Sequence, residues 1–342
     1  MPLPIDDLDT ILSHTADLWS GLRKKNIFLT GGTGFIGKWL VESFLHINEQ
    51  LHLEASIHLL SRSPKQFLAD NPWLADRKDF HLVPGDVRSF KYPPGKFSHI
   101  VHGAASVATP DAPLEAFDTI LAGTNHVLGF AKQCRATRFL FLSSGAVYGK
   151  QPPSIERIPE SFSGAPATNF AQSAYGEAKR AAEWIAFETG RTQNIDVCSA
   201  RCFTFAGPYL PLDKHFAIGN FIRDSMQGTP IRIMGDGTPS RSYLYASDLS
   251  IWLWTILLKG KKNESYNVGS DESLTILALA RLVAKISNRP TDVLVANNSP
   301  SSTGVERYVP DIEKAKTELG LSILTPLVST ITKTMDWIEK LK

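Results

Sequence analysis

The chain opens with a stretch in which apolar and acidic positions alternate at helical spacing. The apolar positions are Ile5, Leu8, Ile11, Leu12 and Leu18. A stripe of this kind is typical of an amphipathic helix that buries one face. We therefore predict an N-terminal helix that ends near Gly21 and serves packing or an interface rather than chemistry.

After residue 25 the pattern changes to short apolar runs. They cover residues 26–29, 57–60, 80–83, 99–102 and 139–142. Runs that are nearly uninterrupted are typical of parallel strands buried on both faces. Helical stretches separate several of them, for example residues 114–134. This alternation predicts an α/β fold with a Rossmann-like, doubly wound parallel sheet.

The second half of the chain has a mixed pattern with loops rich in proline and glycine. We predict strands at 195–200, 231–234 and 266–268, and helices at 174–189, 216–226, 249–258, 274–286, 311–319 and 328–341. Ser247 and Asp248 stand where they could cap the helix at 249–258. The pattern indicates a second, smaller lobe attached to the sheet.

Length and composition narrow the class of protein. A chain of 342 residues with 43% hydrophobic residues suggests about two compact units and excludes wholesale disorder. Lys and Arg total 36 against 34 Asp and Glu, so we expect no nucleic-acid partner. The three cysteines, Cys134, Cys198 and Cys202, form neither a disulfide framework nor a metal-binding pair, which favours the cytoplasm and predicts no metal site.

No stretch has the pattern of a targeting or membrane segment. The first twenty residues carry four aspartates and no Lys or Arg, unlike a signal or transit peptide. The most apolar run, residues 251–258, is much shorter than the roughly 20 residues of a bilayer crossing. We therefore expect no membrane partner.

A glycine-rich turn follows the first predicted strand. Gly31, Gly34 and Gly37 are spaced G-x-x-G-x-x-G between a strand and a helix. In such a turn backbone N–H groups approach a pyrophosphate, and the helix dipole adds a favourable field. The motif alone is weak, because tight βα turns also use glycine. Its place after the first strand of an α/β pattern predicts dinucleotide binding.

The end of the second strand bears on which dinucleotide binds. NAD sites usually carry an acidic residue there, whereas NADP sites supply arginine for the 2′-phosphate. Here the strand runs into Ser61 and Arg62, with no acid. This favours NADP(H), with NAD as the alternative if Arg62 is a solvated loop residue. Asp86, after the third strand, could reach the adenine amino group or form a turn.

A tyrosine and a lysine four residues apart suggest catalysis. Tyr175 and Lys179 share one face of a predicted helix. A cation about 4 Å away at an effective dielectric near 20 would lower a tyrosine pKa by roughly three units. Tyr175 could then exchange a hydroxyl proton as a general acid or base. Ser143 and Ser144 end a central strand, where open α/β sheets bind ligands, and Ser144 could orient the reacting oxygen.

Glycine turn, strand-end serine and Tyr-x-x-x-Lys, in this order, resemble the extended short-chain dehydrogenase/reductases, specifically the nucleotide-sugar epimerase/dehydratase/reductase family. The resemblance covers residues 26–342. Further matching segments are 102–105 (HGAA), 201–208 (RCFTFAGP), 235–243 (GDGTPSRSY), 266–269 (YNVG) and 308–311 (YVPD).

The resemblance implies roles for individual residues. Ser144, Tyr175 and Lys179 would be the catalytic triad, with Tyr175 the acid/base and Lys179 also holding the nicotinamide ribose. The implied cofactor-binding residues are Gly31, Thr33, Gly34, Phe35, Ile36, Gly37, Ser61, Arg62, Asp86, Val87, Ala104, Ala105, Ser143, Tyr175 and Lys179. The implied substrate-binding residues are Ser144, Gly145, Thr204, Phe216, Arg241 and Arg307, with Arg241 at the nucleotide diphosphate.

The chain also departs from the family pattern at four positions. Members that dehydrate at C5–C6 resemble one another in an Asp-Glu pair after the catalytic hydroxyl, and decarboxylating members usually have a Glu there. Here Gly145 and Ala146 occupy these positions, and neither transfers a proton. Thr204 and Ile120 stand where the family often has asparagine, which leaves details of substrate contact open.

Two reactions remain, 4-keto reduction and C4 epimerisation. We expect an NADP(H)-dependent reductase of a nucleotide-activated 4-keto-6-deoxy sugar, because Ser61 and Arg62 favour NADP. A C4 epimerase with tightly bound NAD is the alternative. A dehydratase, a decarboxylase and a non-catalytic dinucleotide-binding sensor are disfavoured.

The sequence also predicts domains and assembly. Residues 1–24 form a helical extension, 25–202 and 242–290 the dinucleotide-binding domain, and 203–241 and 291–342 the nucleotide-sugar-binding lobe. Relatives are usually dimers that pair two long helices, here 114–134 and 174–189, so we expect a homodimer. The small apolar residues of the second helix would permit close helix packing, although they would equally serve a monomer core.

Overall fold

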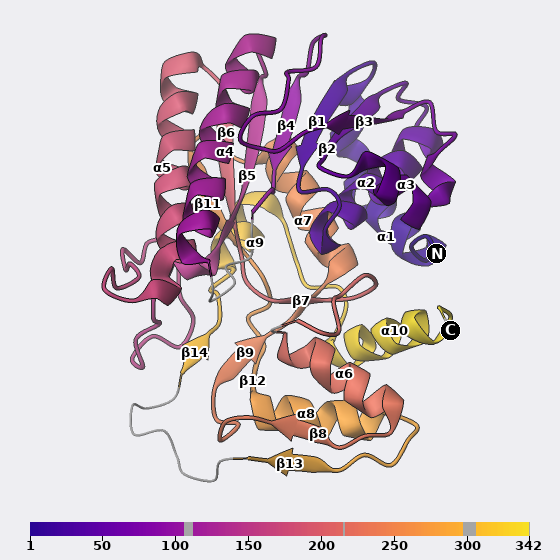
Figure 1. Cartoon of the computed structure of the whole chain (residues 1–342), viewed down its shortest axis with the longest axis vertical. Helices are drawn as coiled ribbons and strands as arrows, with labels where there is room; N and C mark the ends of the chain where they lie inside the picture. Colours follow the sequence, from indigo (N-terminus) through magenta and orange to yellow (C-terminus); the bar gives the residue numbers. More distant parts are fainter. Residues whose placement is uncertain (106–111, 215, 297–305, 342) are drawn as a thin grey trace.

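The computed structural model describes the whole chain except residues 106–111, 215, 297–305 and 342 (Figure 1). Its centre is a seven-stranded parallel sheet in the order β11-β6-β5-β4-β1-β2-β3. The strands are β1 (Asn26–Thr30), β2 (Ser56–Ser61), β3 (Phe80–Pro84), β4 (His99–His102), β5 (Arg138–Ser144), β6 (Asp196–Cys202) and β11 (Glu264–Val268). The predicted doubly wound Rossmann-like fold is confirmed.

Helices cover both faces of the sheet because successive strand residues point to opposite sides. Ile27 and Leu29 of β1 pack in one core, and Phe28 between them packs in the other. The helices over the first core are α1 (Ile5–Thr15), α2 (Phe35–Gln50) and α7 (Ala246–Lys259); those over the second are α4 (Pro113–Cys134) and α5 (Ala174–Gln193). Short apolar strands thus form because both their faces are buried.

The N-terminal segment is an integral part of the first core. Helix α1 is followed by a 3₁₀ turn, η1 (Ala16–Leu22), and both pack against α7. Trp19 is fully buried, with its ring centroid 4.9 Å from that of Trp254. The predicted helix is present, and its acidic residue Asp7 is also buried.

Below the sheet in Figure 1 lies a smaller group of elements with its own apolar core. They are α6 (Ala217–Gln227), β8 (Ile231–Ile233), β9 (Ser240–Ser242), β12 (Ser273–Thr275), α8 (Ile276–Ile286), β13 (Val293–Val295), β14 (Arg307–Tyr308) and α10 (Leu327–Glu339). Helix α8 packs against α6, although the sequence placed these residues with the dinucleotide-binding domain. The pattern of α8 is amphipathic and does not indicate which core its apolar face joins.

The remaining elements connect these parts. They are α3 (Pro64–Asp70), η2 (Pro72–Leu74), η3 (Gly145–Tyr148), η4 (Ala171–Ser173), β7 (Phe205–Ala206), β10 (Leu244–Tyr245) and α9 (Glu313–Leu319). Strands β7 and β10 pair in parallel where the chain passes between the two parts. Among the described residues, no helix is long and apolar enough to cross a bilayer.

The predicted cap of α7 is wrong. The helix begins at Ala246, and its N-cap residue, Tyr245, makes no side-chain cap bond. Asp248 lies inside the helix, where its carboxylate accepts backbone N–H groups of Leu324 and Thr325 at 2.8 and 2.9 Å. The carboxylate therefore anchors the segment before α10 instead of capping its own helix.

Candidate active site

The glycine turn joins β1 tightly to α2. Gly31 has a φ of +77°, and a Cβ there would lie 2.5 Å from the carbonyl carbon of Gly103. A Cβ at Gly37 would lie 2.1 Å from the Cα of Gly32. Both positions therefore require glycine, the first for its conformation and the second for the close approach of helix and turn.

The N-terminus of α2 meets the requirements of a phosphate site. Its N-cap, Gly34, has no side chain to bind the first N–H groups of the helix. Thr33 and Gly34 are exposed, and Phe35 and Ile36 are half-buried, so the turn is open to solvent. Free N–H groups and the helix dipole together favour an anion at this place.

A buried histidine fixes the floor of the turn. His102 at the end of β4 lies 2.7 Å from the Thr30 hydroxyl through Nδ1 and 3.0 Å from the Thr124 hydroxyl through Nε2. The Thr30 hydroxyl also accepts the N–H of Ala104 at 3.1 Å. Burial, aided by the charge of Lys179, lowers the pKa of His102 to about 3, so the ring is neutral.

These bonds place Ala104 beside Gly31, and Ala105 follows it in the chain; the resemblance implies both for the cofactor site. Thr30 and Thr124 are not among the residues predicted for the site. A histidine in a buried strand needs polar partners, and that requirement is the signal that could have found them.

The end of β2 carries no carboxylate. Ser61 is buried, and its hydroxyl accepts the N–H of Ser63 at 3.2 Å, while Arg62 is exposed. Asp86 accepts both the backbone N–H and the guanidinium of Arg88, each at 2.9 Å. These bonds, with a smaller contribution from Arg62, lower the pKa of Asp86.

Asp86 is therefore held by Arg88, and its predicted contact with adenine would compete with that pair. Val87, also predicted at the cofactor site, is buried against α4, since a Cβ at Gly123 would lie 2.9 Å from its methyl carbon. The Val87 side chain is therefore part of the second apolar core, beneath the candidate cofactor site.

Strand β5 and helix α5 bring the three candidate catalytic residues together. Ser144 ends β5, and Tyr175 and Lys179 lie in the first turns of α5. Lys179 is buried, donates from Nζ to the Leu142 carbonyl oxygen at 2.6 Å and lies 5.9 Å from the centroid of the Tyr175 ring. Ser144 accepts the N–H of Ala146 at 3.1 Å through its hydroxyl oxygen.

Burial dominates the proton affinities of this group. It raises the pKa of Tyr175 to about 12, which a hydrogen bond from Ser144 only partly offsets. Burial also lowers the pKa of Lys179 to about 8. The expected lowering of the tyrosine pKa by Lys179 is not found, because the ammonium is directed to the Leu142 carbonyl and burial acts in the opposite sense. Tyr175 therefore holds its proton at neutral pH.

Phe203 and Tyr308 form a wall beside Ser144. A Cβ at Gly145 would lie 2.7 Å from both the Tyr308 hydroxyl and the Phe203 ring. The ring centroids of Phe203 and Tyr308 are 4.6 Å apart. The Tyr308 hydroxyl lies 3.5 Å from the Ser144 hydroxyl oxygen. Sequence reasoning quoted both aromatic residues only as family matches and missed this wall. Spacing gives no signal for it, because Tyr308 is 164 residues from Ser144.

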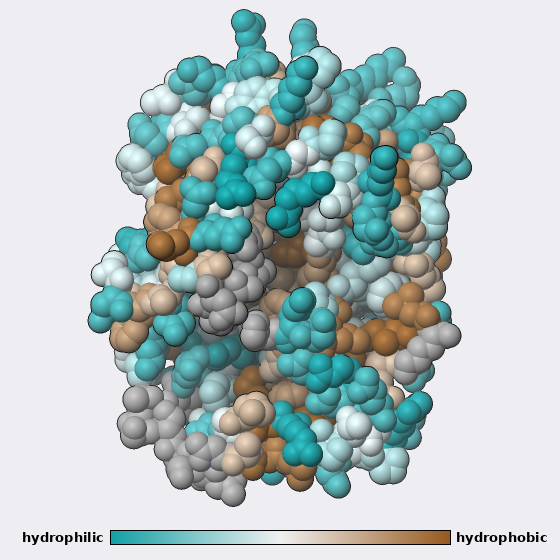
Figure 2. All heavy atoms as spheres, in the orientation of Figure 1, coloured by the Kyte–Doolittle hydropathy of each residue, from teal (hydrophilic) through white to brown (hydrophobic). Residues whose placement is uncertain are grey.

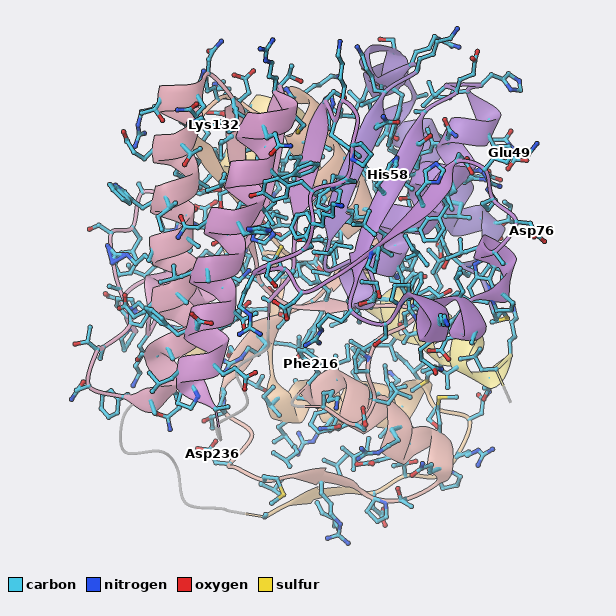
Figure 3. All side chains as sticks on the ribbon, turned by 45° about the horizontal axis from the view of Figure 1, so that its top comes forward. Glu49, His58, Asp76, Lys132, Phe216 and Asp236 are labelled. Atoms are coloured by element: carbon cyan, nitrogen blue, oxygen red, sulfur yellow. The ribbon has the colours of Figure 1, made fainter. Side chains whose placement is uncertain are left out.

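The predicted substrate residues divide into two groups. Arg241 on β9 forms an ion pair with Glu306 and lies 5.9 Å from the Tyr308 ring centroid, so it adjoins the Ser144 wall. Figure 3 shows Phe216, which is 39% exposed, at the start of α6 below the sheet. Thr204 donates to the Ser242 carbonyl, and Arg307 donates to the Pro153 carbonyl at 2.8 Å, so both are engaged elsewhere. The surface is hollowed between the sheet and the α6 region (Figure 2).

The residues present fit a nicotinamide dinucleotide. The cradle of Gly31 and Gly37 admits close approach of a pyrophosphate. Ser143 is buried, and among the described residues its hydroxyl has no hydrogen-bond partner. A buried hydroxyl without a partner at a strand end is suited to a polar group of a bound ligand.

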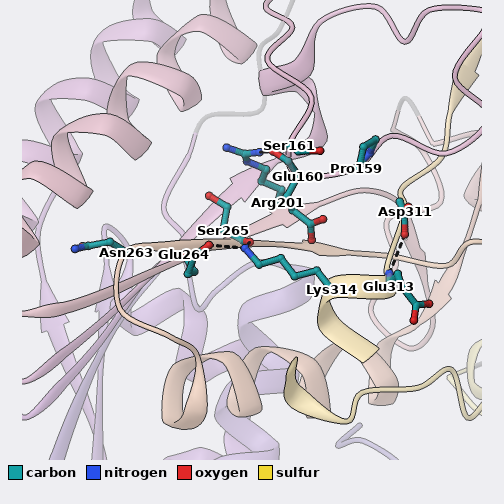
Figure 4. Close-up of a pocket in the computed structure, with 10 residues that line it drawn as sticks. All are labelled: Pro159, Glu160, Ser161, Arg201, Asn263, Glu264, Ser265, Asp311, Glu313 and Lys314. Carbon is teal, nitrogen blue, oxygen red and sulfur yellow. Dashed lines mark hydrogen bonds and ion pairs between the residues drawn. The ribbon is translucent and has the colours of Figure 1, made fainter. Parts of the chain in front are cut away.

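A separate pocket of about 520 Å³ contains none of the predicted site residues. It lies along the outer edge of β11, lined by Pro159, Glu160, Ser161, Arg201, Asn263, Glu264, Ser265, Asp311, Glu313 and Lys314 (Figure 4). Glu160 accepts the N–H of Asn267 at 2.7 Å, and Lys314 donates to the Ser265 carbonyl at 2.9 Å. These side chains satisfy the free edge of the sheet, which explains the charged lining.

Comparison with known proteins identifies the class. Residues 27–269 match the model of the NAD dependent epimerase/dehydratase family. The chain is 30% identical over 295 residues to UDP-glucuronic acid decarboxylase 3 of Arabidopsis thaliana, covering 86% of this chain and 83% of that protein. The chain thus belongs to this family, and it is an enzyme of the extended short-chain dehydrogenase/reductase type.

Solved structures share the fold. UDP-N-acetylglucosamine 4-epimerase from Methanobrevibacter ruminantium aligns with a TM-score of 0.79 at 20% identity, covering 94% of this chain and 100% of that one. UDP-glucuronic acid 4-epimerase from Bacillus cereus, solved with UDP-glucuronic acid and NAD, aligns with a TM-score of 0.78 at 21% identity, covering 93% and 100%.

Proposed function

We propose that the protein is an NADP(H)-dependent reductase that transfers a hydride to C4 of a nucleotide-activated 4-keto-6-deoxy sugar. The observation that carries the proposal is the wall of Phe203 and Tyr308 at Gly145. It leaves no room for a carboxylate at Gly145, and Ala146 beside it carries none, so the pair that dehydration would use and the Glu of decarboxylation are both missing. Reduction and epimerisation, which use only a hydroxyl proton at C4, remain.

The residues of the site have distinct roles in this reaction. Bound reduced nicotinamide supplies the hydride. Tyr175, whose raised pKa of about 12 keeps the hydroxyl protonated at neutral pH, donates the proton to the C4 oxygen. Ser144 orients that oxygen by a hydrogen bond. Lys179, whose ammonium donates to the Leu142 carbonyl, would use a remaining N–H to hold the nicotinamide ribose.

The preference for NADP(H) rests on the end of β2. Arg62 is exposed there, no acidic residue follows the strand, and a guanidinium binds phosphate oxygens in a forked geometry. The family as a whole is NAD-dependent, and the Bacillus cereus neighbour holds NAD. Arg62 therefore carries the preference for NADP(H) over the NAD of the family.

The nucleotide-sugar assignment is supported by the relatives, whose names state UDP-sugars. Arg241 beside Tyr308 is assigned to the diphosphate and Phe216 to the nucleotide. Thr204 and Arg307 would have to exchange their present carbonyl partners for substrate. The substrate lobe then comprises residues 203–241 and 291–342 together with α8, which packs in the same core.

A cytoplasmic homodimer completes the proposal. Helices α4 and α5 pack side by side and each exposes a large apolar residue, Leu114 at 83% and Trp184 at 64%. A second copy covering this face would bury both. We expect Trp184→Glu to elute as a monomer in size-exclusion chromatography; elution at the monomer position by the wild type would contradict the dimer.

The second candidate function is C4 epimerisation with tightly bound NAD. It is supported by the epimerases among the neighbours and by the same triad. Denaturing the purified protein and identifying the released nucleotide separates the two functions. Stoichiometric NAD would favour the epimerase, whereas empty protein or NADP would favour the reductase.

The decisive assay adds NADPH and nucleotide 4-keto-6-deoxy sugars and follows absorbance at 340 nm. We expect stoichiometric oxidation, abolished by Tyr175→Phe and retained by the control Tyr92→Phe, whose hydroxyl bonds the His126 carbonyl outside the site. Arg62→Gln should raise KM for NADPH more than for NADH, and the exposed control Arg281→Gln should not. Absence of oxidation with any such sugar would refute the reductase.

A further inference from the structure

Exposed basic residues occur in three of the segments that precede the parallel strands, at the edge of the sheet that Figure 1 shows away from the second lobe. We call this group the basic end; its residues are Arg23, Lys24, Lys25, Lys96, Lys132 and Arg135. They come from segments 21–26, 94–98 and 130–138, none of which contains an Asp or Glu. Figure 2 shows hydrophilic side chains projecting from this edge.

The sheet order brings these three segments side by side. Strand β4 lies between β1 and β5, so the loops that precede the three strands are neighbours. Asn26 donates from its amide to the Lys96 carbonyl at 3.0 Å and accepts the N–H of Ser98 at 3.1 Å. The N–H of Thr137 reaches the Ser98 carbonyl at 2.8 Å. Residues more than 100 positions apart therefore form one surface.

The charges of the basic end are largely uncompensated. Within the described ranges, Lys24 alone among the six has a carboxylate within 4 Å, that of Glu54 at 3.5 Å. The acidic residues labelled in Figure 3, Glu49 and Asp76, lie on the opposite side of the view from Lys132. The whole chain has a formal charge of only +2, so the rest of the chain is net negative and the basic end holds an excess of positive charge.

We propose that the basic end docks the enzyme on an anionic lipid surface; the expectation of no membrane partner rested on targeting and bilayer-crossing segments and did not consider surface charge. Exposed lysines and arginines near such a surface are attracted to its headgroups without needing a shaped pocket. None of the exposed large apolar side chains belongs to the basic end, so it offers no aromatic platform for stacking nucleic-acid bases. The docking is therefore electrostatic and peripheral, without insertion into the bilayer.

The fold gives this docking a definite orientation. Ser144 and the glycine turn lie at the carboxyl ends of the same strands, away from the basic end. A molecule held by its basic end keeps the candidate active site open to solvent. Docking is thus compatible with turnover and is independent of which sugar reaction the site performs.

The test is co-sedimentation of the wild type with vesicles of phosphatidylcholine alone or mixed with phosphatidylserine. We expect binding to the anionic vesicles only, weakening as salt screens the charges. The triple variant Lys96→Gln/Lys132→Gln/Arg135→Gln should lose on the order of 100-fold in apparent affinity, about five-fold for each charge.

The matched control is Arg281→Gln/Lys285→Gln/Arg289→Gln, which removes three exposed charges from α8 and the residues after it, at the other end of the molecule. It should bind vesicles like the wild type, and both triple variants should keep the wild-type turnover. The proposal is overturned if the wild type ignores anionic vesicles, if both triple variants lose binding equally, or if the wild type binds RNA but not vesicles.

Discussion

Burial sets the chemistry of the individual residues at the candidate active site. Tyr175 and Lys179 lie in an apolar setting that disfavours the charged form of each, which raises one pKa and lowers the other. Lys179 keeps its place because its ammonium donates to the Leu142 carbonyl and lies 4.8 Å from the Phe141 ring centroid. Burying the charged Lys179 ammonium therefore lowers the free energy of unfolding of the protein.

That cost should appear in the pH dependence of unfolding. The pKa of Lys179 is about 8 in the folded protein and 10.5 ordinarily, so between these values the unfolded chain binds more protons and stability rises with pH. The variant Lys179→Met has no ammonium to titrate, so its stability should not show this rise with pH. The stability difference, wild type minus variant, should grow by about 3 kcal/mol from pH 7 to 10.5. Urea unfolding at several pH values measures it, and parallel curves would refute the burial argument.

The wall beside Ser144 predicts intolerance of any side chain at Gly145. Gly145→Ala would push into Phe203 and Tyr308 and should destabilise the fold by about 1–3 kcal/mol. Activity should fall with it, because the wall adjoins Ser144. Gly21→Ala is the control, since a Cβ there meets nothing within 4 Å. Equal stability of the two variants in thermal unfolding would show that Phe203 and Tyr308 move aside without cost and would contradict the prediction.

The sequence predicts the residues of the site whose relation is local. Tyr175 and Lys179 share a helix face by their spacing, and Ser144 follows a recognisable strand. Phe203 and Tyr308 could not be predicted, since their contact depends on how β14 returns to the sheet from the second lobe. The predicted and the missed residues differ in how far apart in the sequence the contacting residues are, and not in residue type.

At the scale of the elements, side-chain hydrogen bonds connect the ends of strands β1 and β4 to helix α4. His102 bridges Thr30 and Thr124 and thereby fixes the glycine turn relative to the neighbouring strand. Neutral imidazole is required, because a protonated ring could not accept a hydrogen bond and has no counter-charge there. Protonation of His102 at low pH would therefore break its hydrogen bonds to Thr30 and Thr124 and destabilise the fold.

The acid sensitivity has a definite sign. The pKa of His102 is about 3 when folded against 6.5 ordinarily, so its stabilising effect is complete above pH 6.5 and is lost as the pH falls toward 3. The loss amounts to about 5 kcal/mol. We expect His102→Asn to be less stable at pH 7 but to lose stability less steeply between pH 6.5 and 4.

Denaturant unfolding across this range measures the effect, with exposed His52→Asn as the control that should follow the wild type. Equal pH slopes for His102→Asn and the wild type would contradict the role of His102.

Apolar runs and helical spacing predicted the long elements and two short ones, β8 and α9. The buried strands and the helices α4 and α5 follow from these patterns. The two-residue strands β7 and β14 carry no periodic signal and exist only because a distant partner pairs with them. Helix α8 is predicted as an element, but its choice of core is a tertiary property.

On the scale of the whole molecule, the N-terminal segment ties the two parts together. The buried carboxylate of Asp7 accepts the Tyr245 hydroxyl at 2.7 Å and the Lys333 ammonium at 2.6 Å. Glu42 similarly accepts the N–H of Leu3 at 2.7 Å and the Tyr209 hydroxyl at 2.6 Å. Helix α1 thus contacts both α7 and α10.

We therefore expect Asp7→Ala to destabilise the protein by about 3–5 kcal/mol, because it leaves polar partners unpaired at a buried site. Asp6→Ala removes an exposed carboxylate from the same helical turn and should cost less than about 1 kcal/mol. Thermal unfolding of the two variants compares them directly. Comparable losses would show that Asp7 acts only through the helix dipole.

The contact between Asp7 and Lys333 has a consequence for how the protein is made. The two residues are 326 positions apart, so the first helix leaves the ribosome long before its partner is synthesised. The sheet is also incomplete until β11, which follows α6, β8 and β9 of the second lobe in the chain, has been synthesised. Many multidomain proteins fold one domain at a time during synthesis. This chain pairs helix α1 with helix α10, so α1 makes its full set of native contacts only after Lys333 has been synthesised.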